Sequence, residues 1–326
     1  MIPKVSVVVP TYKRPDYLER CLRALLSLDF IAADFEIIIV DDANSAATRQ
    51  QVEELAQRSQ SDGYTIMYVP MAGALHGPAA ARNAGWQQAR GEIIAFIDDD
   101  CIPELSWLKA GVAAFDDDLA AVAGKIVVPL QHEYTDYEYS VSQLSQAEFV
   151  TANCFYRRSV LQRLSGFDAR YRRSWCEDTD LFFKLLEHNL PYLKVPAAIV
   201  MHPVRPARWG TSLRQQKKGL YEALLFKKHP ALYRERIQAK PLWGYYCTFG
   251  VFLLFLAGLL AGLWLLAVIA LCAWLYMTTR LCIQRLQKTS RAPLHVLEMF
   301  ITSALIPPLA IFWRCYGMLK FHVLFL

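Results

Sequence analysis

Three consecutive acidic residues, Asp98, Asp99 and Asp100, follow the apolar run Ile93–Ile97. If the acids continue a strand, Asp98 and Asp100 point to one side and Asp99 to the other. Two carboxylates that leave most of a cation's coordination open suit Mg²⁺ or Mn²⁺ shared with a diphosphate, and adjacent acids repel one another without a cation. The alternative is a solvated loop, or an N-cap for a helix that starts near Ser106. We favour a metal site held by Asp98 and Asp100.

A second acidic pair, Asp41 and Asp42, follows the apolar run Glu36–Val40, and His202 follows the run Ala197–Met201. A carboxylate of the pair could accept a hydrogen bond from a nucleobase N–H or a ribose hydroxyl, although Asp is also common in strand-to-helix turns. A lone His is more often structural than a ligand, but the expected metal site makes the two roles equally supported here. These residues are candidates for the same site as the acidic run.

Glu177, Asp178 and Asp180 open a segment whose apolar residues repeat with helical spacing. The helix dipole favours acids at a helix N-terminus, and Asp180 can pair with Lys184 one turn later, so a structural role is open. A carboxylate held at a helix start can instead serve as a general base toward a hydroxyl group.

The elements that must position these residues alternate between strands and helices over the first hundred residues. Strands spaced by helices imply an α/β fold with a mostly parallel, mixed sheet and helices on both faces. Ligands bind such sheets beyond the carboxyl ends of the strands, where both acidic turns lie. The expected strands are Val5–Val9, Glu36–Val40, Thr65–Val69 and Ile93–Ile97, and helices are expected from Pro15, through Val52 and Leu55, and over Ala79–Ala89.

Beyond residue 120 the pattern is less regular. A strand is expected over Ala121–Val128, a polar, aromatic loop over His132–Tyr139, a helix over Thr179–His188 and a strand over Ala197–Met201.

Residues 242–277 contain no Asp, Glu, Lys, Arg or His over 36 positions, more than the roughly 20 that one transmembrane helix needs. Ten Lys or Arg and two acids lie between Arg205 and Lys240, and further basic residues follow the run. A single tilted helix would put one basic cluster outside, against the positive-inside tendency. We therefore expect a hairpin that turns near Gly258–Gly262 and keeps both clusters inside.

The last apolar stretch, Met299–Trp313, is 15 residues long and contains Pro307 and Pro308. Its length and its prolines predict an interfacial or re-entrant segment over residues 294–320. The expected organisation is a soluble domain over 1–205, a basic amphipathic juxtamembrane segment over 206–240 and a membrane module over 241–326.

The net charge of +5 lies mainly beside the apolar run, which suits an anionic lipid leaflet. No nucleic-acid module accompanies the basic residues, so nucleic-acid binding is not expected. Eight cysteines without a CxxC pair indicate reduced thiols in a cytosolic compartment, and the N-terminal MIPKVSVVVPTY lacks the features of a signal peptide.

Five segments in this order resemble the family 2 glycosyltransferases, which are inverting enzymes of the GT-A fold. The resemblance covers roughly Val5 to Pro203, and no single segment decides it. The segments are VSVVVPTYKR (Val5–Arg14), IIIVDD (Ile37–Asp42), GPAAARNAG (Gly77–Gly85), AFIDDD (Ala95–Asp100), and SGFD with EDTDL (Ser165–Asp168 and Glu177–Leu181).

The resemblance implies a role for each matching residue. Asp178 falls on the catalytic base, Asp98 and Asp100 on the DxD metal ligands, and His202 on a further metal ligand. The implied cofactor is Mg²⁺ or Mn²⁺, and the implied donor is a UDP-, GDP- or dTDP-sugar. The acceptor side would include Asn153, Trp175 and Glu177. The donor side would include Pro10, Thr11, Tyr12, Arg14, Asp41, Asp42, Arg82, Asn83, Asp98 and Asp99.

The sequence also departs from the family pattern. Lys184 stands where many relatives have Arg, and Ser165 where many have a second Gly, but neither change removes a group that the chemistry needs. The QxxRW motif of processive synthases is missing, because Gln215 and Gln216 lead only to Lys217-Lys218-Gly219. The resemblance therefore implies a single sugar transfer per acceptor.

The expected function is an inverting glycosyltransferase with its catalytic domain on the cytoplasmic face of a membrane, the bacterial inner membrane being favoured. Its acceptor would be lipid-linked or a cell-envelope polysaccharide, and the membrane module would either anchor the enzyme in lipid or also present the acceptor. The alternatives are a polyprenyl-phosphate sugar synthase and a degenerate scaffold that binds a nucleotide sugar. No GxGxxG follows the first strand, which disfavours a nucleotide-binding oxidoreductase.

Overall fold

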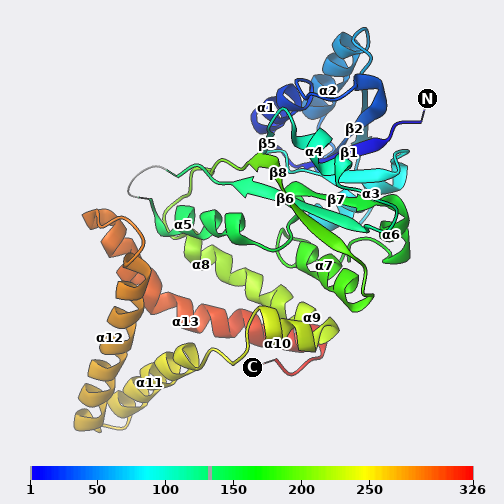
Figure 1. Cartoon of the computed structure of the whole chain (residues 1–326). Coiled ribbons are helices and arrows are strands. Elements are labelled where there is room, and N and C mark those ends of the chain that lie inside the picture. The colour runs from blue at the N-terminus through cyan, green and yellow to red at the C-terminus, as the bar shows by residue number, and fades with distance from the viewer. Residues whose placement is uncertain (1, 131–133, 326) are drawn as a thin grey trace. The chain divides into compact units, whose positions relative to one another are not determined.

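The computed structural model describes residues 2–130 and 134–325 and divides the chain into two compact units (Figure 1). The first unit comprises Met1–Pro129 and Ser142–Val204, and the second comprises Leu130–Val141 and Arg205–Leu326. The grouping of residues 130–141 with the C-terminal part of the chain is a feature that the sequence did not predict.

The first unit is built on an eight-stranded mixed sheet with the strand order β3-β2-β1-β4-β7-β6-β8-β5. Its first four strands are parallel, whereas β7 runs antiparallel to both of its neighbours. Parallel pairing brings the carboxyl ends of β1, β2 and β4 to one edge of the sheet, as expected. The strands are β1 (Val5–Thr11), β2 (Phe35–Asp41), β3 (Thr65–Pro70), β4 (Ile93–Phe96), β5 (Ile102–Pro103), β6 (Ala121–Val127), β7 (Cys154–Arg157) and β8 (Tyr192–Met201).

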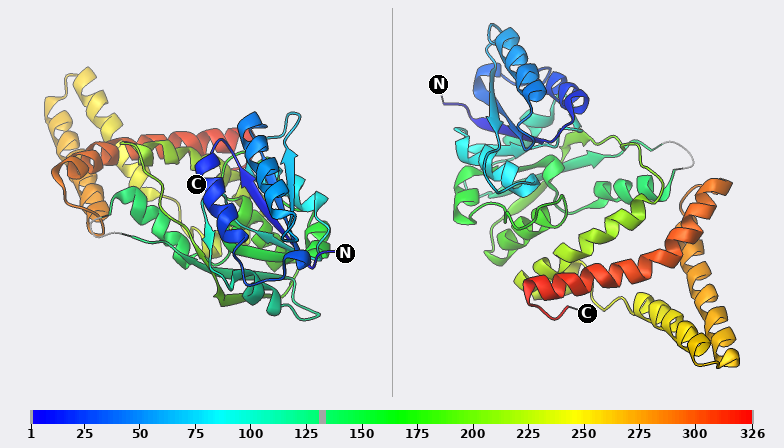
Figure 2. Two further views of the ribbon diagram at one scale, coloured as in Figure 1. Left: turned by 90° about the horizontal axis from the view of Figure 1, so that it is seen from above. Right: turned by 180° about the vertical axis from the view of Figure 1, so that it is seen from behind.

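Helices cover both faces of this sheet, as Figures 1 and 2 show. The helices of the first unit are α1 (Pro15–Leu25), α2 (Ala46–Ser59), α3 (Pro78–Gln88), α4 (Trp107–Ala113), α6 (Arg158–Arg163) and α7 (Glu177–Glu187), with short 3-10 turns η1 (Ala32–Asp34), η2 (Gln143–Gln146) and η3 (Thr151–Asn153).

Alternation along β1 explains how the two faces are filled. Val7 points into a buried apolar cluster that includes Leu18 of α1. On the opposite face, a Cβ on Gly85 would lie 2.4 Å from Val8 Cγ1, so only glycine allows α3 to approach the strand this closely. This contact fixes α3, which carries Arg82 and two of the expected site motifs.

The second unit is helical, and three of its helices are long and apolar enough to cross a membrane. α11 and α12 lie side by side and are joined by a break at residues 261–263, near the expected turn (Figure 2). Its described helices are α8 (Thr211–Gln215), η4 (Gln216–Lys218), α9 (Gly219–Lys228), α10 (Pro230–Arg236), α11 (Trp243–Leu260), α12 (Trp264–Leu286) and α13 (Pro293–Phe321), while α5 (Asp136–Ser142) begins in this unit.

Two expectations for irregular structure are wrong. The described part of the expected loop over His132–Tyr139 becomes helical at Asp136, because Thr135 and Glu138 form a capping box: the Thr135 N–H and Oγ1 donate to Glu138 Oε2 at 2.6 and 2.9 Å. His132 itself lies outside the described residues.

The second wrong expectation is that Pro307 and Pro308 interrupt the last apolar segment. α13 instead continues through both prolines for 29 residues. Proline removes a backbone donor, but the remaining turns and neighbouring helices can hold a long apolar helix together.

Candidate active site

The acidic run Asp98–Asp100 does not continue its strand. β4 ends at Phe96, and the Cys101 N–H donates to the Asp98 carbonyl at 3.1 Å, which closes a turn. The strand alternation used to pair Asp98 with Asp100 is therefore wrong, because successive side chains in a turn do not alternate across a sheet. Each of the three acids has its own partners.

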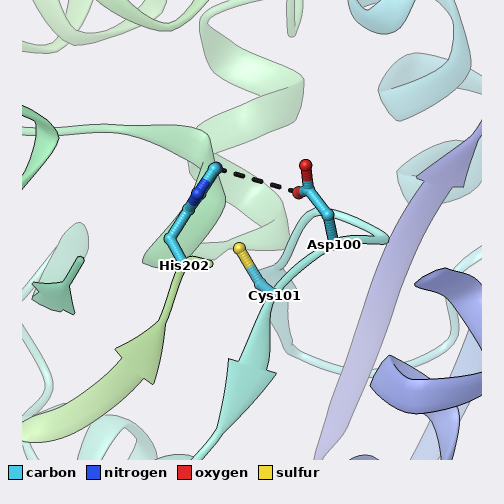
Figure 3. A group of neighbouring side chains, drawn as sticks. All are labelled: Asp100, Cys101 and His202. Atoms are coloured by element: carbon cyan, nitrogen blue, oxygen red, sulfur yellow. Dashed lines mark ion pairs between the residues drawn. The ribbon is translucent and has the colours of Figure 1, made fainter. Parts of the chain in front are cut away.

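Asp100 belongs to a compact buried group with Cys101 and His202, in which the possible ligand atoms lie within 4.8 Å of one another (Figure 3). His202 Nε2 lies 3.8 Å from Asp100 Oδ1, and the buried His202 Nδ1 has no hydrogen-bond partner among the described residues. A carboxylate and an imidazole with a spare nitrogen fit a divalent cation.

Cys101 is the least suitable ligand of this group. Burial, reinforced by the charges of Asp98 and Asp100, raises the pKa of its thiol well above the usual value. Only a thiolate binds metal well, so this thiol does not favour a soft cation. The oxygen and nitrogen donors of Asp100 and His202 are the ones that fit.

Asp99 is buried and ties the acidic turn to the end of β1. Its Oδ2 accepts a hydrogen bond from Thr11 Oγ1 at 2.8 Å, and its Oδ1 lies 3.0 Å from Arg14 Nη1. Burial raises the pKa of Asp99 to about 6, although Arg14 acts in the opposite direction. Thr11 and Arg14, both expected on the donor side, thus contact the acidic turn itself.

Arg82 joins the acidic turn to α7. It is 2% exposed, and its Nη2 lies 2.7 Å from Asp98 Oδ1 while its Nη1 lies 3.0 Å from Glu177 Oε1. Burial opposes its charge, but the two carboxylates outweigh burial and raise the pKa of Arg82. We expected Arg82 to face a diphosphate, whereas the structure places its guanidinium between two carboxylates.

Asp178 follows Glu177 at the start of α7 and is only partly buried. Its Oδ1 accepts the Thr179 N–H at 2.7 Å. Burial raises the pKa of Asp178, while the Thr179 hydrogen bond and Arg82 lower it and Asp98 raises it further. Burial also raises the pKa of Glu177, with Asp178 adding to the effect. These two acids are poised to bind protons more readily than solvated carboxylates.

Asp180, the third acid of this helix start, has a structural role. It is fully buried, lies 3.6 Å from Lys184 Nζ, and accepts a hydrogen bond from Tyr171 Oη at 3.2 Å. The pairing with Lys184 one turn later is the structural alternative that its spacing indicated.

Asp41 and Asp42 are both engaged with the chain around them. The fully buried Asp41 accepts hydrogen bonds from the Ser45 N–H at 2.7 Å and from Tyr68 Oη at 3.0 Å, so it closes the turn after β2. Asp42 contacts His76 Nδ1 at 2.9 Å and the Gly77 N–H at 3.0 Å, which raises the pKa of His76. Of the pair, only the partly exposed Asp42 has a surface for a nucleotide.

Two asparagines expected at the site are used internally. Asn153 is fully buried, and its amide bonds Trp107 Nε1 and the carbonyls of Lys125 and Ala198, so its assignment to the acceptor side is wrong. A fully satisfied core amide has no group left for a ligand.

Asn83 binds both backbone polar groups of Phe167, at 2.7 and 2.9 Å, rather than an open surface. It therefore holds the SGFD turn against α3. The remaining expected contacts, Pro10, Tyr12 and Trp175, are not buried, and Tyr12 and Trp175 are 51% and 37% exposed.

Comparison with known proteins identifies the family. Residues 6–180, which carry the acidic turn, Arg82 and the start of α7, match the family described as glycosyl transferase family 2. The chain belongs to this family. It is a glycosyltransferase that uses a nucleotide-sugar donor.

Individual relatives of this glycosyltransferase agree with the assignment. It is 28% identical over 234 residues to glycosyltransferase AglE of Haloferax volcanii, covering 66% of this chain and 71% of AglE. It is 38% identical over 99 residues to the GalNAc(5)-diNAcBac-PP-undecaprenol beta-1,3-glucosyltransferase of Campylobacter jejuni, covering only 30% of each chain.

The fold of the glycosyltransferase is also found in solved structures. The mannosyltransferase PcManGT from Pyrobaculum calidifontis, solved in complex with GDP-Man and Mn²⁺, superimposes with a TM-score of 0.64 at 18% identity over 97% of this chain and 88% of PcManGT. The likeness establishes a GT-A-type sheet with three apolar helices at the C-terminus of this glycosyltransferase.

Sequence reasoning missed two connections in this glycosyltransferase. One is the contact of His76 with Asp42, which the HGP sequence at residues 76–78 could have indicated because His76 directly precedes the helix start. The other is the double ion pair of Arg82, for which the sequence carries no local signal because its partners lie 16 and 95 residues away.

Proposed function

We propose that this glycosyltransferase moves one sugar, with inversion at the anomeric carbon, from its nucleotide-sugar donor to a lipid-linked or cell-envelope acceptor at a membrane. The observation that carries the proposal is the bridge of Arg82 between Asp98 and Glu177. It holds the expected metal-binding turn and the helix start with Asp178 in one buried network, and a displacement reaction requires such fixed proximity of its two sides.

Asp178 is the proposed general base. Its Oδ1 is held by Thr179, which leaves Oδ2 to take the proton of an acceptor hydroxyl. The acceptor oxygen would attack the anomeric carbon from the face opposite the leaving diphosphate, which inverts the configuration. A base of raised pKa retains the proton more readily after it has been taken.

Asp100 and His202 would hold a divalent cation, with Asp98 beside them as the second acid of the DxD pattern. A bound Mg²⁺ or Mn²⁺ would neutralise charge on the departing nucleoside diphosphate. Mn²⁺ in the complex of PcManGT supports this choice of cofactor. Thr11 and Arg14 hold Asp99 and so keep the turn in place around the donor.

A membrane-linked acceptor is supported by the three apolar helices, which are long enough to cross a bilayer. The Campylobacter jejuni relative, whose name specifies an undecaprenol-linked saccharide, supports the same acceptor class. Basic residues on both sides of the apolar run favour a catalytic unit on the cytoplasmic face of a bacterial inner membrane.

The proposal is tested by Asp178→Asn in the full-length protein in detergent, with lipid extract as the acceptor. We expect transfer to be abolished while the donor still raises the melting temperature. Asp117→Asn, an exposed acid of the same unit, is the matched control and should keep full activity. Near-normal turnover of Asp178→Asn would remove the base assignment. A thermal-shift screen of UDP-, GDP- and dTDP-sugars with and without Mn²⁺ identifies the donor.

A further inference from the structure

The second unit contains a pocket of about 230 Å³ that the proposed mechanism does not use. It lies between α5, the segment that leads into α8, and the first turns of α13, elements that can be located in Figure 1. Ligand sites for drug-sized molecules have volumes of roughly 300–1,000 Å³, so this pocket suits a single small ring with its substituent.

The carboxylates in the pocket wall are already engaged. Asp136 lies 2.8 Å from Arg285 Nη2, and Glu298 Oε1 accepts the Gly210 N–H at 2.7 Å. Glu138 caps the start of α5 through Thr135, as described above. These acids build the wall, and a free cation would have to compete with their present partners.

Three other lining side chains keep their polar groups unused. Arg208, Trp209 and Tyr137 line the pocket, and within the described ranges 2–130 and 134–325 their guanidinium, indole N–H and hydroxyl form no hydrogen bond or ion pair. Trp209 is 53% exposed, which is unusual for so large an apolar ring unless another molecule covers it.

This set of free groups defines a ligand chemistry. Aromatic rings pack on the apolar face of a sugar ring, and an unpaired guanidinium binds a phosphate through two parallel hydrogen bonds. We infer that the pocket binds the sugar-phosphate head group of the acceptor lipid, with Trp209 and Tyr137 on the sugar and Arg208 on the phosphate. This inference rests on the proposed lipid-linked acceptor and makes Arg208 and Trp209 determinants of acceptor affinity.

The test separates acceptor KM from kcat, with full-length protein in detergent and lipid extract as the acceptor. Arg208→Ala and Trp209→Ala should each raise the acceptor KM about tenfold, the loss expected for a charge-assisted or aromatic contact. The kcat at saturating acceptor and the thermal shift by the donor should stay unchanged. Arg214→Ala and Trp264→Ala, which remove exposed side chains of the same unit outside the pocket, are the matched controls.

Competition identifies the source of the phosphate. Farnesyl phosphate should inhibit the wild-type protein at lower concentration than inorganic phosphate, and Arg208→Ala should lose this preference. Equal potency of the two competitors would assign the pocket to a soluble phosphate and overturn the head-group assignment.

The failure of this inference differs from the failure of the proposed function. If the wild-type protein transfers sugar to lipid extract and both pocket variants match it in KM, the pocket assignment is wrong and the proposed function stands. If the wild-type protein transfers no sugar to lipid with any donor, the proposed function fails and the pocket assignment fails with it.

Discussion

Each unit of the molecule contains an arginine that joins distant segments, and the two arginines differ in what they leave over. Arg82 in the first unit bridges Asp98 and Glu177, but its buried Nε and the buried Glu177 Oε2 have no partner among the described residues. Arg285 in the second unit uses all three nitrogens, on Asp136 and on the hydroxyls of Thr302, Ser303 and Ser212 among other groups.

This difference separates a site from a scaffold. Buried polar groups in folded proteins are nearly always satisfied, and the exceptions require an explanation. Around Arg82 the unsatisfied atoms lie beside Asp178 and near the expected metal ligands, where a bound substrate would complete them. Around Arg285 nothing is missing, which fits a contact that only holds helices together.

The largest effect is expected for Arg82→Ala. It leaves two carboxylates without their counter-charge in a buried position, which costs about 3–5 kcal/mol in the free energy of unfolding. Transfer should fall to background, because the two sides of the site lose their connection. Urea unfolding and transfer assays of the full chain measure both effects.

Two further variants control this prediction. Arg23→Ala removes an arginine that is 74% exposed and should change the free energy of unfolding little. Arg82→Lys keeps the charge but cannot present two fixed N–H groups to two carboxylates, so it should restore part of the stability and little of the activity. A loss below about 1 kcal/mol for Arg82→Ala would contradict the buried bridge.

Arg285→Ala should have a smaller effect, of about 1–3 kcal/mol in the free energy of unfolding. Its partner Asp136 has a side chain that is 22% exposed, so water can replace part of the lost contact. Donor binding should be unchanged, because the partners of Arg285 all belong to the second unit. Arg280→Ala, an exposed arginine of the same helix, is the control, and a loss of donor binding in Arg285→Ala would end the contrast between the two arginines.

How well the sequence predicted each region follows from the range of the interactions. The parallel strands, the site at their carboxyl ends and the break between α11 and α12 depend on periodicity and on nearby glycines, so they were predictable. The partners of Arg82, and the internal use of Asn153, depend on residues that are far apart in the chain, and no local pattern encodes them. The capping box of Thr135 and Glu138 was a local signal that the sequence analysis missed.

His202→Ala sharpens the comparison at the metal site. Removal of one of the few proposed ligands should weaken Mn²⁺ binding by about 10–100-fold or more, the range found when groups that merely orient metal ligands are lost. Mn²⁺ titration of EDTA-treated protein, followed by donor hydrolysis, measures the change. His188→Ala removes an exposed His that contacts only the Lys184 carbonyl and serves as the control. Unchanged Mn²⁺ dependence in His202→Ala would remove His202 from the site.

The smallest effect is expected in the pH dependence of transfer. Burial raises the pKa of Asp178, so the base is protonated at a higher pH than a solvated carboxyl. Activity should therefore rise with pH through this raised pKa, and kcat should fall on acidification earlier than it would for an ordinary Asp.

Thr179→Val tests the sign of this effect. Thr179 Oγ1 lies 3.3 Å from Asp178 Oδ1 and lowers its pKa, whereas valine has a similar shape and keeps the backbone N–H. Loss of the hydroxyl should raise the pKa of Asp178 further and move the acid limb of the kcat profile to higher pH. Thr65→Val, at an exposed strand position, should leave the limb in place. A shift to lower pH, or an equal shift in both variants, would show that Asp178 does not govern the limb, and the unsatisfied atoms around Arg82 would then need another explanation.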